Sequence, residues 1–126
     1  MSKLEQRTTL SARVTVSLLV ADMKETISFY ERLGFRVTGR HDDEWAEVSR
    51  DQATLQFFTA PPQGVADEPV LSGTIYFYPT DVSAIAAEWS NVISLEWGPA
   101  EMPYGMREFG IKDPNGYFLA FTEPVD

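Results

Sequence analysis

The pattern of apolar and polar positions divides the chain into short elements whose order repeats. Residues 13–20 are rich in β-branched and aliphatic side chains, a composition typical of a strand. Asp22 and Glu25 then have the spacing of a helix capping box. The predicted helix carries one apolar stripe, made by Met23, Ile27, Tyr30 and Leu33. Gly34 is a natural place for that helix to end.

Three more strands are predicted after this helix, and the order then starts again. Residues 60–69 contain three prolines and one glycine without periodicity, which indicates a linker. A second helix is predicted to begin at Asp81 or Thr80. The predicted strands are residues 35–40, 45–49 and 53–59 before the linker, and 73–79, 92–97, 105–112 and 117–122 after it. We therefore expect one domain, with modules at about 13–59 and 71–124 joined by a linker at 60–70.

Composition and charge narrow the class of protein. No apolar run is long enough to span a bilayer, the first residues lack the apolar core of a signal peptide, and the chain has no cysteine. These features predict a cytoplasmic protein. Residues 51–126 hold two basic and eleven acidic residues and so carry the whole net charge of −9. This acidity argues against nucleic acid as a partner; it suits either a cationic small molecule or simple solubility.

Two stretches carry a resemblance to a known family. The segments LLVADMKETISFYERLGFRV (18–37) and GMREFGIKDPNGYFLAFTEP (105–124) resemble the two ends of the glyoxalase, bleomycin-resistance and extradiol-dioxygenase superfamily, also called vicinal oxygen chelate proteins. The resemblance spans roughly residues 13–124. It implies an α+β fold of two βαβββ modules, with curved mixed sheets around a cleft, and a homodimer.

The positions that bind metal in enzymes of this superfamily are unusual in this chain. Transferring them by resemblance gives Thr15, Gln56, Thr74 and Ala120, whereas a stable divalent site needs three or four His or carboxylate ligands. The single histidine, His41, lies in an acidic turn that is read either as an ion site or as a solvated turn. We therefore expect no metal and no cofactor, which favours binding over catalysis without deciding the question.

Strand alternation predicts which side chains face the cleft. The sides that face the helices are apolar and predict the core; they carry Val14, Val16, Leu18, Val20, Ile75, Phe77, Tyr117, Leu119 and Phe121. The opposite faces include Leu19, Ala120 and Thr122. The candidate ligand-binding residues are Trp45, Gln56, Phe58, Tyr76, Tyr78, Trp97, Met102, Tyr104, Glu108 and Phe118. Residues 96–105 are expected to form a mobile loop across the mouth, with Glu96, Glu101 and Glu108 making an anionic clamp.

The segment at 98–116 most resembles the bleomycin-resistance branch of the superfamily. That resemblance implies a metal-independent protein that sequesters a bulky aromatic, cationic compound, such as a bleomycin-type antibiotic, and confers drug resistance without turnover. One alternative is a metal-dependent glyoxalase-like lyase, isomerase or dioxygenase that uses Gln56 with Glu47 or Glu108. A dimeric scaffold that has lost its ligand is the other alternative.

Overall fold

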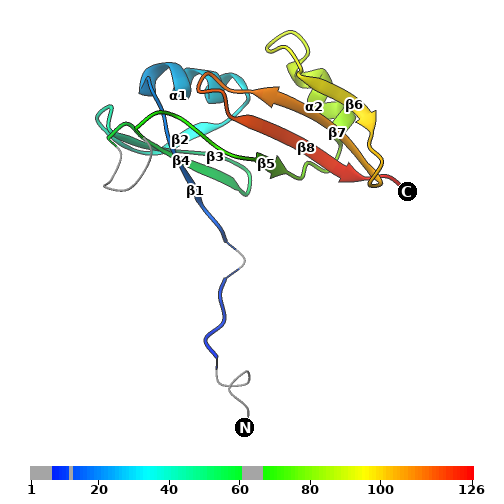
Figure 1. Ribbon diagram of the computed structural model, residues 1–126, viewed down its shortest axis with the longest axis horizontal. Helices are drawn as coiled ribbons and strands as arrows, with labels where there is room; N and C mark the ends of the chain where they lie inside the picture. Colours follow the sequence, from blue (N-terminus) through cyan, green and yellow to red (C-terminus); the bar gives the residue numbers. More distant parts are fainter. Residues whose placement is uncertain (1–6, 12, 61–66) are drawn as a thin grey trace.

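The computed structural model describes residues 7–11, 13–60 and 67–126, which form two mixed four-stranded sheets with one helix each (Figure 1). This architecture confirms the predicted α+β fold. The first sheet has the order β1 (Val16–Leu19), β4 (Ala53–Phe58), β3 (Trp45–Arg50), β2 (Arg36–His41) and carries α1 (Met23–Arg32). The second sheet has the order β5 (Thr74–Phe77), β8 (Phe118–Pro124), β7 (Met106–Lys112), β6 (Trp97–Glu101) and carries α2 (Val82–Trp89).

Both modules pair their strands in the same way. In each, the first strand runs parallel to the last, and the other pairs are antiparallel. A helical crossover between parallel strands leaves that helix on one face of the sheet. The opposite face of each sheet is therefore free of helices, and β1 and β5 are left as edge strands.

The helix starts follow from local sequence. The Asp22 carboxylate accepts a hydrogen bond from the Glu25 backbone N–H at 3.0 Å, and the Asp81 carboxylate accepts one from Ala84 at 3.0 Å. Each bond satisfies one of the unpaired amides at a helix N-terminus. Asp81, not Thr80, is thus the cap of α2. Past α1, Gly34 has a φ of 88°, a conformation that glycine adopts without steric cost.

Two expectations about the strands were wrong, and one about the linker falls mostly outside the described residues. The strand predicted at 92–97 lies later, as β6, so residues 97–101 pair with β7 and are not a loop across a cleft. Pro99 is tolerated there because β6 is an edge strand with a register shift between Trp97 and Ala100. The first strand begins only at Val16, and Val14 is 80% exposed. Most of the predicted linker (61–66) lies outside the described residues.

A single apolar core joins the two modules. Buried residues from β1, α1, β3 and β4 belong to the same cluster as Val82, Ala86 and Trp89 of α2 and Phe109, Leu119 and Phe121 of the second sheet. Among the described residues, no helix is long and apolar enough to cross a membrane. The side chains that face the helices are buried in this core. A ligand-binding site is therefore expected on the opposite, helix-free faces of the sheets.

The last turn of the second module closes on the first module. The buried Asp113 carboxylate accepts hydrogen bonds from the Tyr30 hydroxyl at 2.8 Å and from the backbone N–H groups of Asn115 and Tyr117. Burial raises the pKa of Asp113 despite these donors. The Asn115 side chain accepts from the Ala21 N–H at 2.9 Å and donates to the Thr26 hydroxyl at 3.0 Å. These bonds fix one module against the other.

Candidate ligand-binding site

The free face of the second sheet has an indole ring lying on a glycine. Register places Tyr76, Ala120, Gly110 and Trp97 in one row across the four strands. A Cβ added to Gly110 would lie 2.2 Å from the Trp97 ring, so the ring occupies the space where a side chain would stand. Ala120 is fully buried (0% exposed). The expectation that Ala120 lines an open cleft was therefore wrong.

Glu108 is the polar centre of this face. Its side chain is 2% exposed, and its two oxygens accept hydrogen bonds from Trp97 Nε1 at 2.9 Å and from the Tyr104 hydroxyl at 2.7 Å. The bond to Glu108 raises the pKa of Tyr104, so the phenol stays protonated. Within the described part of the chain, no Lys, Arg or His side chain forms a salt bridge with Glu108.

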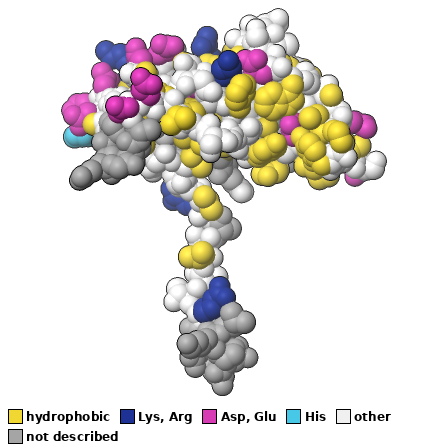
Figure 2. Space-filling view, viewed as in Figure 1, with side chains coloured by type: hydrophobic (Ala, Val, Ile, Leu, Met, Phe, Trp, Pro, Cys, Tyr) yellow, Lys and Arg dark blue, Asp and Glu magenta, His cyan; other side chains and the backbone are white. Residues whose placement is uncertain are grey.

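Further aromatic side chains lie on the same sheet face as this carboxylate. The Phe118 ring lies 6.0 Å from Trp97, centroid to centroid, and Tyr76 stands in the row beside Ala120. Figure 2 shows hydrophobic side chains gathered over the second sheet, whereas acidic and basic side chains are more frequent over the first module. We call Tyr76, Trp97, Tyr104, Glu108 and Phe118 the Glu108 cluster. It combines flat apolar rings with one buried anion, a composition suited to an organic ligand.

The free face of the first sheet is more polar. The Glu47 carboxylate accepts hydrogen bonds from Gln56 Nε2 at 2.9 Å and from the Thr38 hydroxyl at 2.8 Å. These two bonds lower the pKa of Glu47. Trp45 lies opposite Phe58 in the ladder, and its ring packs on Gly39. This face therefore has one tryptophan on a glycine, as the second sheet does, beside a hydrogen-bonded amide and carboxylate.

The structure thus divides the predicted site residues into two groups. Tyr76, Trp97, Tyr104, Glu108 and Phe118 share the second sheet, while Trp45, Gln56 and Phe58 share the first. Among the described residues, no hydrogen bond or ring contact joins the two groups. Tyr78 follows β5 and is well exposed, and Met102 lies in the turn between β6 and β7. One chain alone does not bring all ten residues into one cleft.

Other expectations about the cleft were wrong. Leu19 and Thr122 are buried and do not line an open surface. Glu101 pairs with Arg107 at 3.4 Å on the side of β7 opposite Glu108, and Glu96 precedes β6 and is exposed. Only one of the three expected clamp carboxylates belongs to the cluster. Gly39 and Gly110 were not predicted as site residues, although a glycine inside a strand is a known sign of a close approach.

The residues at the four transferred metal positions do not fit a divalent ion. Ala120 has no donor atom, and the Gln56 amide is bonded to Glu47. In the described residues, no group of three or more His, Cys, Asp or Glu side chains could hold a metal. His41 is exposed, with Nε2 3.9 Å from Glu44. These four positions therefore do not form a metal site by themselves, and a metal-free protein remains a prediction.

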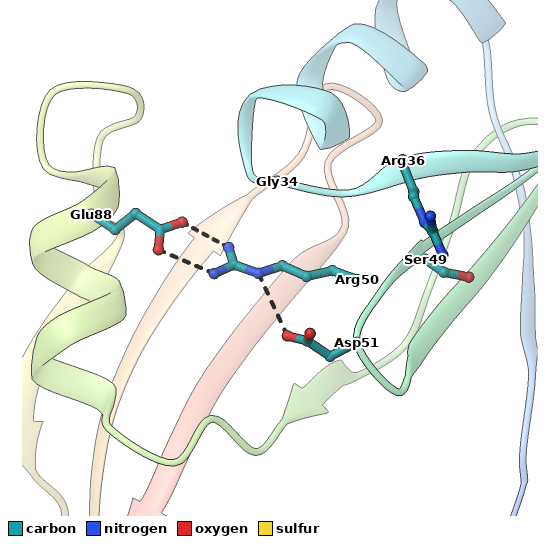
Figure 3. A pocket seen from close by; sticks show the side chains of 6 residues that line it. All are labelled: Gly34, Arg36, Ser49, Arg50, Asp51 and Glu88. Carbon is teal, nitrogen blue, oxygen red and sulfur yellow. Dashed lines mark hydrogen bonds and ion pairs between the residues drawn. The ribbon is translucent and has the colours of Figure 1, made fainter.

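Two cavities lie between the modules, away from Glu108. One, of about 900 Å³, is lined mainly by apolar side chains of both modules and reaches Tyr76 and Tyr78 at its edge. The other, of about 500 Å³, contains an ion pair (Figure 3). There Arg50 donates to Glu88 at 2.8 and 3.1 Å and to the Leu33 carbonyl at 2.7 Å. The Glu88 and Asp51 carboxylates face this guanidinium and balance its charge. The second cavity therefore holds a structural contact between the modules and not an anion-binding site.

Comparison with known proteins agrees with the fold described above. Residues 12–121 match the family model described as Glyoxalase/Bleomycin resistance protein/Dioxygenase superfamily. A bleomycin-binding protein from bleomycin-producing Streptomyces verticillus, solved with copper(II)-bleomycin, is 27% identical with a TM-score of 0.69, covering 94% of this chain and 99% of its own. A second bleomycin-binding protein, solved with bleomycin, is 22% identical with a TM-score of 0.71, covering 90% and 98%.

The same fold also occurs in an enzyme. A lactoylglutathione lyase from Agrobacterium tumefaciens is 19% identical with a TM-score of 0.70, covering 92% of this chain and 96% of its own. No protein among the curated ones matches the sequence. At these identities the shared fold is common to binders and enzymes, so the site residues have to distinguish between the two functions.

Proposed function

Because this chain belongs to the glyoxalase, bleomycin-resistance and dioxygenase superfamily, we propose that it is a metal-independent binding protein that sequesters a bulky aromatic, cationic compound. The observation that carries this proposal is the Glu108 cluster, where Trp97 and Tyr104 donate to a buried carboxylate. Tyr76 and Phe118 lie on the same face of the sheet. Rings of this kind stack on a planar ligand and attract a cation through their faces. Binding alone lowers the free concentration of such a compound.

A second copy of the chain completes the site in this proposal. The two groups of predicted residues lie on separate sheets, and β1 and β5 are edge strands beside the apolar cavity of about 900 Å³. Leu10 and Val14 are exposed on the N-terminal segment, which leads away from the body in Figure 1. A homodimer that covers these apolar surfaces can set the first sheet of one copy against the second sheet of the other.

Calorimetric titration with metal-free bleomycin tests the proposed function. We expect saturable binding, and a ligand concentration of about 100 times the dissociation constant should raise the free energy of unfolding by about 2.7 kcal/mol. Phe118→Ala should weaken binding because it removes a ring from the cluster. Lys24→Ala, on the exposed side of α1, serves as the control. Failure of bleomycin and related aromatic cations to bind would reject the proposal and favour a scaffold without a ligand.

The enzymatic alternative rests on the proximity of Gln56 and Glu47, where the amide N–H of Gln56 donates to the carboxylate, because an amide oxygen and a carboxylate can both bind a metal. Elemental analysis of the purified protein separates this alternative from the binding function. Zinc, nickel, manganese or iron at near-stoichiometric amounts, lost in Glu47→Ala, would replace the binding proposal with a metal-dependent reaction.

A further inference from the structure

The environment of Glu108 is unusual for a buried acid. The side chain is almost completely buried, yet both hydrogen bonds to it come from neutral donors, an indole N–H and a phenol O–H. Buried carboxylates are normally paired with a cation or held by several donors. The described residues supply neither a cation nor a third donor. An added positively charged donor would therefore find a strong acceptor here.

A polar atom without a hydrogen-bond partner among the described residues lies next to Glu108. Thr122 is directly opposite Glu108 in the β7–β8 ladder, so the two side chains lie on the same face of the sheet. Directly opposite residues have Cβ atoms about 5 Å apart. The Thr122 hydroxyl is buried and has no hydrogen-bond partner within the described part of the chain. A donor with two or more N–H bonds can satisfy both oxygens at once.

The two donors that now hold Glu108 differ in how firmly they are fixed. The Trp97 ring is packed on Gly110, and its N–H cannot leave Glu108 without moving the whole ring. The Tyr104 side chain is 56% exposed and comes from the short turn between β6 and β7. A change in its side-chain rotamer alone removes its hydroxyl from Glu108. Tyr104 is thus the donor that an incoming group can replace.

We infer, within the binding function proposed above, that Glu108 and Thr122 form a subsite for a primary ammonium, amidinium or guanidinium group of the ligand, with the Tyr104 hydroxyl holding that place until the ligand displaces it. The aromatic rings of the cluster contact the apolar part of the same ligand. A quaternary ammonium has the same charge but no N–H, so it can stack on the rings without using the subsite.

Three probes with the same naphthylmethyl group test this subsite on the full-length protein. They are 1-naphthylmethylammonium, its N,N,N-trimethyl derivative and neutral 1-naphthylmethanol, titrated while the indole N–H resonance of Trp97 is followed by NMR. We expect the primary ammonium to bind roughly tenfold more tightly than the other two, because a hydrogen bond to a charged group contributes about that factor. Equal binding of the primary and quaternary cations would overturn the subsite.

Three conservative variants assign the effect to named atoms. Glu108→Gln keeps an acceptor for Trp97 and should reduce the preference for the primary ammonium to about twofold or less. Thr122→Val should reduce it partly. Tyr104→Phe should tighten binding of the primary ammonium several-fold, because the ligand no longer competes with an internal donor. Weaker binding in Tyr104→Phe would contradict the proposal, since it would show that the hydroxyl assists the ligand.

The failure of this subsite can be told apart from the failure of the binding function. If all three probes bind equally and Phe118→Ala weakens them all, the aromatic face binds ligands and only the subsite is rejected. If no probe and no bleomycin binds to the wild-type protein, both proposals are rejected.

Discussion

At the scale of single residues, two glycines decide where two indole rings lie. Gly110 and Gly39 each leave open the space that a Cβ would fill, and Trp97 and Trp45 pack into it. On the second sheet the consequence reaches the site, because the position of Trp97 also determines the hydrogen bond to Glu108. Residues with no functional group of their own therefore shape the candidate binding face.

Gly110→Ala should displace Trp97, since its Cβ would lie 2.2 Å from the ring. We expect the free energy of unfolding to fall by about 1–3 kcal/mol, as in other overpacked sites, and the Trp97 indole N–H resonance to lose its hydrogen-bonded shift. Urea unfolding and NMR measure the two effects. Gly39→Ala is the matched control: its nearest Trp45 ring atoms are 3.0 Å away, so a smaller loss is expected. An equal loss in both variants would contradict this account.

Asp113 should make stability depend on pH in a defined direction. Burial raises the pKa of Asp113 in the folded protein above the ordinary aspartate value of 3.8, so the folded state binds more protons than the unfolded state just above that value. The contribution of Asp113 to stability therefore increases as the pH falls through the folded pKa. Wild type should gain relative to Asp113→Asn between pH 7 and about pH 4 in urea unfolding. A relative loss on acidification would refute the assignment.

At the scale of elements, Arg50 joins the end of α1 to α2. Its guanidinium donates to Glu88 (Figure 3). It also donates to the Leu33 carbonyl and lies 5.7 Å from the centroid of the Trp89 ring. The bond to Leu33 satisfies a carbonyl at the C-terminus of α1, where no helical partner is available. One side chain from β3 thus links the two helices across the module boundary.

Arg50→Ala should lower the free energy of unfolding by about 1–2 kcal/mol, through the lost hydrogen bonds and the lost packing on Trp89. In a double-mutant cycle with Glu88→Ala, we expect a coupling below about 1 kcal/mol because both side chains are partly exposed. Asp51→Ala is the control: its carboxylate is largely exposed and lies 4.0 Å from Arg50. An Arg50→Ala variant as stable as Asp51→Ala would show that the link contributes nothing.

The sequence predicted the elements whose limits depend on residues close together in the chain, such as the two helix starts. Asp22 and Asp81 cap helices through residues three positions away, so a short stretch of sequence contains the signal. Strand β6 was misplaced because Gly98 and Pro99 resemble a loop, and only pairing with β7 makes them part of a strand. That pairing depends on residues later in the chain, which no local pattern reveals.

The candidate site was predicted less completely than the fold. Alternation along β5 and β8 correctly placed Tyr76 and Phe118 on one face. The position of Trp97 on Gly110, and the burial of Thr122, depend on contacts across several strands. Periodicity also carries no information on how two modules sit together, so it did not predict the separation of Gln56 from Glu108.

At the scale of the whole molecule, the shared core makes the modules interdependent. Residues of α2 and of the second sheet pack in the same buried cluster as α1 and the first sheet. We therefore expect a fragment that ends at Ala60 to lack the circular dichroism and the cooperative unfolding of a folded domain. Mixing it with a fragment of residues 67–126 should restore both signals. Cooperative unfolding of the first fragment alone would show that its core is sufficient.

The hydrogen bond from the Ala21 N–H to Asn115 joins residues 94 positions apart, and this separation affects how the protein is made. A ribosome adds residues at about 5–20 per second, and early segments often fold while later ones are still awaited. Here the start of α1 lacks its Asn115 partner until nearly the whole chain has been synthesised. During that interval the part of the shared core that the second module supplies is also missing, so the growing chain should depend on chaperones that shield apolar surfaces.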